Sequence, residues 1–176
     1  MRPPTGASGP PVPIQEAVGE FVAMLVDRGA AATKVAPTRL VPPHQLGEDD
    51  EQAQQVIAAY RDQHGSIAAL SLADLHFAAS TGAALGMVPA SAVQEAVKAG
   101  SLPETLFENY REVANIMTSL LNSPSSPHLK AAEAWLSDDD DVPAEVWDVI
   151  AAPSKRREFA VRIEGYGDGR IGIVIR

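Results

Sequence analysis

Hydrophobic residues recur three or four positions apart in several segments of the chain. This spacing, which places apolar side chains on one face of a helix, covers residues 14–28, 72–87, 91–98 and 103–122. Glycine lies just after the first and third of these segments, and glycine favours the ends of helices. Helices are therefore predicted at all of these positions.

Shorter apolar runs predict paired strands. Val56–Tyr60 and Ile67–Leu72 are separated by a polar segment that contains a glycine, which is typical of an antiparallel pair. Residues 159–163 and 170–175 lie on either side of the glycine-rich segment 165–169, which is also a hairpin signal. The last residues of the chain are therefore expected to lie in a sheet.

Two further segments complete the predicted sheet. Residues 31–36 predict a short strand that Pro37 ends. Residues 129–136 fit either a strand or a helical turn, since their alanines favour a helix and their position between turns favours a strand. Strands near both ends with helices between them predict an α+β fold, an antiparallel or mixed sheet of about six strands covered by long helices.

The segment 72–87 carries an unusual number of small residues. Ser71 and Asp74, three positions apart, resemble a capping box at the start of its helix. Small side chains along the helix would let another element approach closely; they are Ala78, Ala79, Gly82, Ala83 and Gly86.

Length and composition narrow the class of protein. The chain has 176 residues, 45% of them hydrophobic, which predicts one globular domain that we place at residues 14–176. The Pro- and Gly-rich residues 1–13 lack the features of a secretory signal and predict a flexible tail. No apolar run is long enough to span a membrane, so no membrane partner is expected. The absence of cysteine excludes thiolate chemistry and is compatible with a cytoplasmic protein.

Charge and motif spacing exclude other classes. Fourteen basic against 23 acidic residues give a net charge of −9, which repels a phosphate backbone, so nucleic acid is not an expected partner. The four histidines lie in separate segments without the spacing of a helical metal pair. The acidic run Asp138–Asp141 lacks the alternating ligands of a calcium loop and predicts a solvated loop. No motif indicates a cofactor.

The candidate chemistry lies on the predicted helix 103–122. Its apolar residues form one stripe that must face the core: Leu106, Tyr110, Val113, Met117, Leu120 and Leu121. At about 100° per residue, Glu108, Glu112, Asn115 and Ser119 fall on the opposite, solvent-facing side. Glu112 and Asn115 are three positions apart, so a carboxylate and an amide project side by side and can engage one partner together.

This pair, in the string Glu108-Asn109-Tyr110-Arg111-Glu112-Val113-Ala114-Asn115, resembles the E-x-x-N helix of the CheC/CheX family of chemotaxis phosphatases. The predicted order of elements over about residues 14–176 is also similar to that family. Only one such helix is found, because the helix over 14–28 has Glu16 and Glu20 but no asparagine at the matching spacing. The resemblance therefore implies a CheX-like arrangement with a single site.

The resemblance also implies a substrate, a phosphorylated response-regulator receiver domain in chemotaxis or related signalling. Glu112 would engage the receiver's lysine, and Asn115 would orient the water that attacks the aspartyl phosphate. The receiver would supply its own Mg²⁺, so the chain needs no cofactor of its own. Glu108 and Ser119, on the same face, are expected to contact the receiver.

Two alternatives remain open in the sequence. The family motif usually has Asp or Ser where this chain has Glu108, and a proline in the region of Asp138. These departures motivate a non-catalytic binding module of the same fold that docks a receiver or a motility component. The other alternative is a purely structural partner-binding domain unrelated to chemotaxis, which would bind no receiver. A homodimer that pairs exposed sheet edges is compatible with both functions.

Overall fold

The computed structural model describes residues 10, 12–122 and 128–176. Its elements, in chain order, are α1 (Gln15–Val26), β1 (Ala30–Val35), a 3₁₀ turn η1 (Pro43–Gln45), β2 (Gln55–Arg61), β3 (Ile67–Asp74), α2 (Leu75–Leu85), α3 (Ala90–Ala99), α4 (Glu104–Ile116), α5 (Thr118–Leu121), β4 (Lys130–Leu136), α6 (Ala144–Ala151), β5 (Lys155–Ile163) and β6 (Gly167–Ile175). Most of the predicted tail, residues 1–9 and 11, lies outside the described residues.

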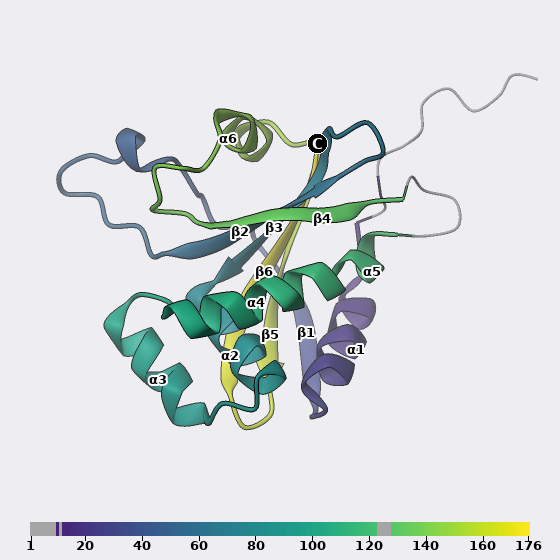
Figure 1. The fold of residues 1–176 in the computed structure, drawn as a ribbon, viewed down its shortest axis with the longest axis vertical. Coiled ribbons are helices and arrows are strands. Elements are labelled where there is room, and N and C mark those ends of the chain that lie inside the picture. Colours follow the sequence, from purple (N-terminus) through teal and green to yellow (C-terminus); the bar gives the residue numbers. More distant parts are fainter. Residues whose placement is uncertain (1–9, 11, 123–127) are drawn as a thin grey trace, which may run out of the picture.

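The strands form one six-stranded sheet in the order β1-β5-β6-β3-β2-β4 (Figure 1). All described pairings are antiparallel. The predicted α+β class and the predicted number of strands are therefore confirmed, and the sheet is antiparallel rather than mixed. β1 and β4 form its two edges.

Alternation along the strands divides the core into two layers. In β2, Val56, Ala58 and Tyr60 face the layer of helices α1 to α5, whereas Ile57 and Ala59 face the other side. Side chains point alternately to the two faces of a strand, so a strand buried on both faces needs apolar residues at every position. β2 meets this requirement, since Val56–Tyr60 are all at most 2% exposed.

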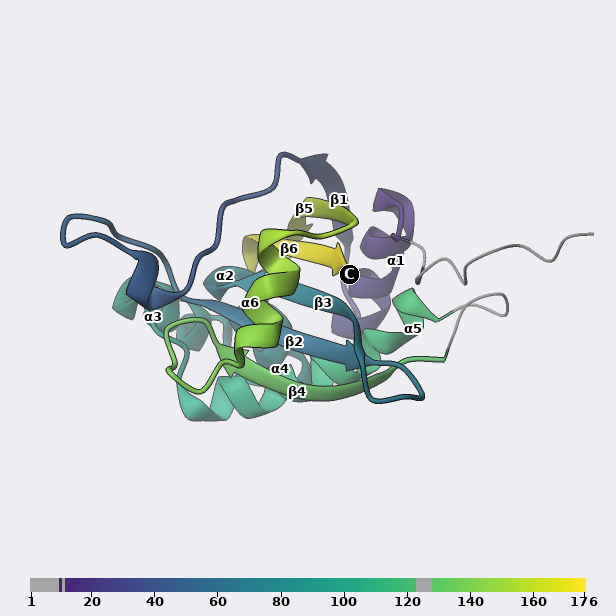
Figure 2. The ribbon, with the colours of Figure 1, turned by 90° about the horizontal axis from the view of Figure 1, so that it is seen from above.

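The second face of the sheet is covered by α6 and by the long segment between β1 and β2 (Figure 2). The sequence reasoning did not predict α6. Pro143 precedes it, and Val146, Val149 and Ile150 repeat at helical spacing and are buried, so the signal was present in a short segment. Residues 129–136, which the sequence left open, form strand β4, because backbone pairing with β2 outweighs the helix propensity of the alanines.

Two predicted helix boundaries were wrong. Ser71 does not begin a capping box, since β3 continues to Asp74 and the Ser71 side chain is buried next to Tyr60. Asp74 itself caps α2 by accepting a hydrogen bond from the Phe77 N–H at 2.8 Å, and it accepts a second from the Arg170 N–H at 3.0 Å. The predicted helix 103–122 is interrupted at Met117, which separates α4 from α5.

The small residues of α2 let α4 pack directly on its backbone, as predicted. A Cβ atom added at Gly82 would lie 2.9 Å from the Leu106 carbonyl oxygen and 3.4 Å from the Tyr110 nitrogen. Real Cβ atoms do not approach a backbone oxygen that closely, so the distance between the two helices depends on this glycine. α2 in turn lies on the sheet and thereby fixes the position of α4.

We expect Gly82→Ala to destabilise the protein. Helix propensity alone favours alanine by about 1 kcal/mol. The clash with the Leu106 carbonyl oxygen should outweigh this gain and lower the free energy of unfolding by about 1–3 kcal/mol. Chemical denaturation monitored by circular dichroism measures the difference, and a variant more stable than the unmodified protein would show that α2 and α4 lie further apart.

Candidate functional site

The polar face of α4 is exposed as the sequence predicts. Leu106, Tyr110 and Val113 are at most 3% exposed and pack on the core, whereas Glu108, Glu112 and Asn115 lie on the solvent side. The amphipathic pattern alone is sufficient to orient this helix, because burial of its apolar stripe leaves only one face for the polar residues.

α4 ends at Ile116, and a side-chain hydrogen bond from α5 reaches the backbone of this helix end. The Thr118 hydroxyl donates a hydrogen bond to the Asn115 carbonyl oxygen, which in a continuous helix would accept from the backbone of a later residue. Ser119, predicted to share the face of Glu112, therefore belongs to α5. The break fixes the position of the Asn115 backbone at the C-terminal end of α4.

A buried hydrogen bond also holds this helix end against the sheet. The Tyr60 hydroxyl of β2 donates to the Ala114 carbonyl oxygen at 2.9 Å and lies 3.1 Å from the Ser71 hydroxyl. Burial raises the pKa of Tyr60, so the hydroxyl stays protonated and remains a donor. The residue directly before Asn115 is thus tied to the centre of the sheet.

A cleft of about 360 Å³ separates α4 from the edge strand β4. Figure 1 shows β4 running along α4. Glu108, Glu112 and Asn115 line the cleft from the helix. The apolar part of the lining consists of four alanines, whose small side chains leave the space open: Ala58, Ala114, Ala131 and Ala134. The sequence predicted the helix side of this cleft but not the strand side.

A second cleft, of about 470 Å³, continues along α5. It is lined by Ser119 and Thr118 and, from the start of β4, by His128 and Lys130. Asn115 lines both clefts. The structure thus brings Glu108, Glu112 and Asn115 together in one cleft and places Ser119 in the adjoining one.

The charged groups of the first cleft differ in their partners. Arg111 forms an exposed ion pair with Glu108 across one helical turn, with 3.3 Å between Nη1 and Oε1. Within residues 10, 12–122 and 128–176, no hydrogen bond or ion pair engages the side chain of Glu112 or Asn115. Glu112 is therefore the carboxylate of the cleft that is most available to a cation.

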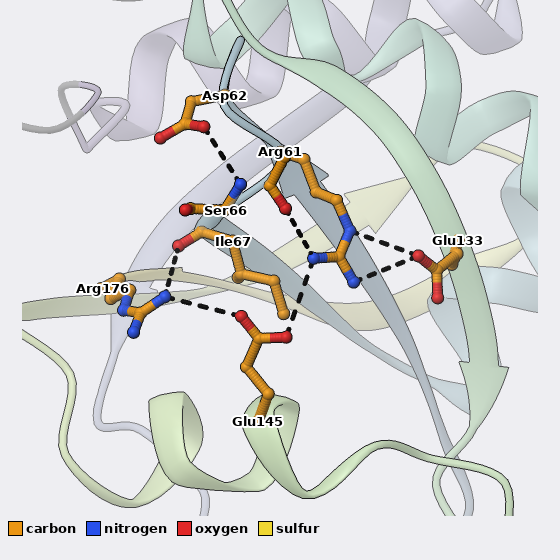
Figure 3. A network of polar contacts seen from close by, with 8 residues as sticks. Arg61, Asp62, Ser66, Ile67, Glu133, Glu145 and Arg176 are labelled. Carbon is orange, nitrogen blue, oxygen red and sulfur yellow. Dashed lines mark hydrogen bonds and ion pairs between the residues drawn. The ribbon is translucent and has the colours of Figure 1, made fainter.

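Glu133, on β4, lines the same cleft, and Arg61 engages its carboxylate at 3.1 Å (Figure 3). Figure 3 also shows Glu145 of α6 between Arg61 and Arg176, with N–O distances of 3.7 and 3.6 Å. This network links the rim of the cleft to α6 and the last residue of the chain. Sequence reasoning missed it, because its members come from elements far apart in the chain.

The described residues bring together no group of three or more histidine, aspartate or glutamate side chains that could hold a metal ion. In the same part of the chain, every helix is too short or too polar to cross a membrane. The polar side chains that line the cleft are carboxylates, one amide and one guanidinium group.

Comparison with known proteins places this geometry in a fold class. No protein-family model and no curated protein matches the sequence. Among solved structures, Thermotoga maritima FliY is 19% identical with a TM-score of 0.57, over 92% of this chain and 88% of that chain. A chain of the FliM–SpeE complex from H. pylori is 7% identical with a TM-score of 0.57, over 92% and 80%.

A chain of the CheX–CheY–BeF₃–Mg²⁺ complex from Borrelia burgdorferi was also found, at 11% identity and a TM-score of 0.44, over 92% of this chain and 94% of that chain. The similarity to FliY and to the FliM–SpeE chain, both at a TM-score of 0.57, establishes the fold. The chain has the CheC/CheX-like fold, as the E-x-x-N resemblance predicted.

We expect Tyr60→Phe to destabilise the protein and Tyr110→Phe to leave its stability unchanged or raise it. The first substitution leaves the Ala114 carbonyl buried without its donor and should cost about 1–3 kcal/mol. The Tyr110 hydroxyl is buried without a hydrogen-bond partner among the described residues, and its ring packs edge-on against Phe77 with centroids 6.3 Å apart. Removing that hydroxyl breaks no hydrogen bond and should leave the free energy of unfolding unchanged or raise it by up to about 1–3 kcal/mol.

Denaturant unfolding of both variants provides this comparison. Equal losses would mean that the Tyr60–Ala114 hydrogen bond does not stabilise the end of α4.

Proposed function

We propose that this protein is a phosphatase that hydrolyses the aspartyl phosphate of a response-regulator receiver docked over the cleft between α4 and β4. The observation that carries the proposal is the pairing of Glu112 and Asn115, which lie side by side in an open cleft without partners among the described residues. The E-x-x-N resemblance and the CheC/CheX-like fold support it.

Glu112 would anchor the receiver. Its neighbour Glu108 is already paired with Arg111, so the carboxylate of Glu112 is the one that a lysine ammonium would find unneutralised. A charge-assisted hydrogen bond to that lysine would set the orientation of the receiver against α4. Glu112 acts by binding, and it needs no change of protonation during the reaction.

Asn115 would position the attacking water. An amide both donates and accepts hydrogen bonds, so it can hold a water molecule at a defined angle to the phosphorus. The Thr118 and Tyr60 hydrogen bonds restrain the backbone on which Asn115 is placed, and such restraint is what catalysis by positioning requires. The alanine lining leaves room for the phosphoryl group and the water.

The Mg²⁺ that neutralises the phosphoryl oxygens would come with the receiver, because the carboxylates of the receiver would bind it. The transferred group is held mainly by electrostatics, so the phosphatase contributes the water and the geometry. After attack by water, the bond between phosphorus and the receiver aspartate oxygen breaks, which releases inorganic phosphate and the free aspartate.

A non-catalytic module that docks a receiver or a motility component is the second candidate. Arg111 and Glu108 occupy the side of the cleft where the CheC/CheX motif has a shorter Asp or Ser, and this pair favours binding without catalysis. The similar chain from H. pylori was solved in a complex of two proteins, FliM and SpeE. Such a module would bind the receiver and leave the lifetime of its phosphate unchanged.

We expect Asn115→Ala to abolish the acceleration and Glu112→Ala mainly to weaken docking. Loss of the amide should lower the rate of dephosphorylation at saturating receiver by about 10²-fold or more. Loss of the carboxylate should raise the receiver concentration needed for half-maximal rate about tenfold, which corresponds to about 1.4 kcal/mol. The measurement is the decay of a phosphorylated chemotaxis-type receiver in Mg²⁺, with and without each variant.

Glu104→Ala is the matched control, because Glu104 is an exposed glutamate in the first turn of α4 outside the lining of the cleft. It should behave as the unmodified protein does. Equal losses in the Glu104, Glu112 and Asn115 variants would contradict the assigned roles, and receiver binding without accelerated decay would favour the docking module.

A further inference from the structure

The segment that connects β1 to β2, residues 36–54, is long for a connection within a compact domain, and its only regular structure is the short η1 turn. It crosses the sheet face that α6 covers, opposite the helix layer that contains α4 (Figure 2). Long connections with little regular structure are usually either functional or disordered. The contacts that fix this segment show what it could bind.

A buried carboxylate anchors the segment to the sheet. Glu158 of β5 is 3% exposed and accepts hydrogen bonds from the Thr38 N–H at 3.1 Å and the Thr38 hydroxyl at 2.9 Å. Arg170 approaches the same carboxylate at 2.8 Å and donates to the Ala36 carbonyl oxygen, also at 2.8 Å. The start of the segment is therefore rigidly placed.

Both arginines at this anchor, Arg170 and Arg156, have a buried Nε without an acceptor among the described residues. Arg156 Nη2 donates to the Thr38 carbonyl oxygen and lies 3.7 Å from Glu158, but the buried Nε has no acceptor among the described residues. Burial lowers the pKa of Arg156, although Glu158 opposes this effect. Since two guanidinium groups share one carboxylate, the cluster remains net positive.

Arg156 lines a cavity of about 390 Å³ between the segment and α6. Arg39 lines it as well, and no ion pair or hydrogen bond of the Arg39 side chain is found within the described part of the chain. Trp147 of α6 and Leu40 add aromatic and apolar surface, and the exposed Asp148 contributes one carboxylate. The cavity thus combines two guanidinium groups with an indole, in a protein whose net charge is −9.

We propose that this cavity binds a small anion that carries a planar ring, with its phosphate or carboxylate group held by Arg39 and Arg156 and its ring packed on Trp147. Guanidinium groups bind phosphate and carboxylate through paired hydrogen bonds, and an indole face favours a flat aromatic partner. The volume fits one ligand of mononucleotide size. The site lies on the opposite face of the sheet from the cleft of Glu112 and Asn115, so it is independent of the proposed phosphatase.

Titration of the full chain with two probes tests the site. AMP presents a ring with a phosphate, and benzoate presents a ring with a carboxylate; adenosine and inorganic phosphate supply the ring and the anion alone. We expect saturable binding of AMP or benzoate, at least about tenfold tighter than adenosine or phosphate, because both parts of the cavity must be filled. Because AMP and benzoate differ in the ring as well as in the anion, a comparison of benzoate with phenyl phosphate identifies the preferred anion.

Trp147 provides a local readout. The sequence has two tryptophans, so a Trp135→Phe variant reports only on Trp147 by fluorescence, and calorimetry on the unmodified chain gives an independent measurement. We expect the fluorescence of Trp147 to be quenched saturably, with the same half-saturating ligand concentration as in the calorimetric titration. Binding heat without any change in Trp147 fluorescence would place the ligand elsewhere and overturn the proposal.

Arg39→Gln should weaken binding of the preferred probe about tenfold without affecting the anchor at Glu158. Arg162→Gln is the matched control, since Arg162 is on the same strand as Arg156, is 80% exposed and pairs only with Asp168 among the described residues. Its affinity should equal that of the unmodified protein. Equal affinity in the Arg39 variant, or no saturable binding of either ringed probe up to about 10 mM, would overturn the proposal.

Discussion

The hydrogen bond from the Tyr60 hydroxyl to the Ala114 carbonyl oxygen connects the centre of the sheet to the end of α4. A carbonyl at the end of a helix must find a donor, and in a buried position only another part of the protein can supply one. Because β2 supplies it, the last turn of α4 cannot rotate without leaving the buried Ala114 carbonyl oxygen without this donor. The orientation of Glu112 and Asn115 therefore depends on a tyrosine in a different layer.

Much of the fold could be predicted from the sequence, because elements that bury one face have apolar residues at regular spacing. The stripe from Leu106 to Leu121 oriented α4, and the two hairpins followed from glycine placement between apolar runs. The break at Met117 was not predicted, and the hydrogen bond of the Thr118 hydroxyl to the Asn115 carbonyl oxygen that accompanies it leaves no mark on the hydrophobic pattern. Helical periodicity continues through such a break and hides it.

The candidate site was predictable only in part, for a related reason. Glu112 and Asn115 are neighbours on one helix, so their spacing determines their geometry. The opposite side of the cleft comes from β4, whose alanines gave no clear preference between strand and helix. Arg61, Glu133 and Glu145 meet only after three separate elements have packed, and no local pattern encodes that meeting. Long-range contacts of this kind require the fold itself.

β4 is at once a wall of the cleft and an edge of the sheet in the described part of the chain. One side of its backbone pairs with β2, and the groups on its other side have no strand to bind. Any extended segment that added to this edge would become a new boundary of the cleft. Pairing at this edge and binding in the cleft would then use the same strand, and each would change the affinity of the other.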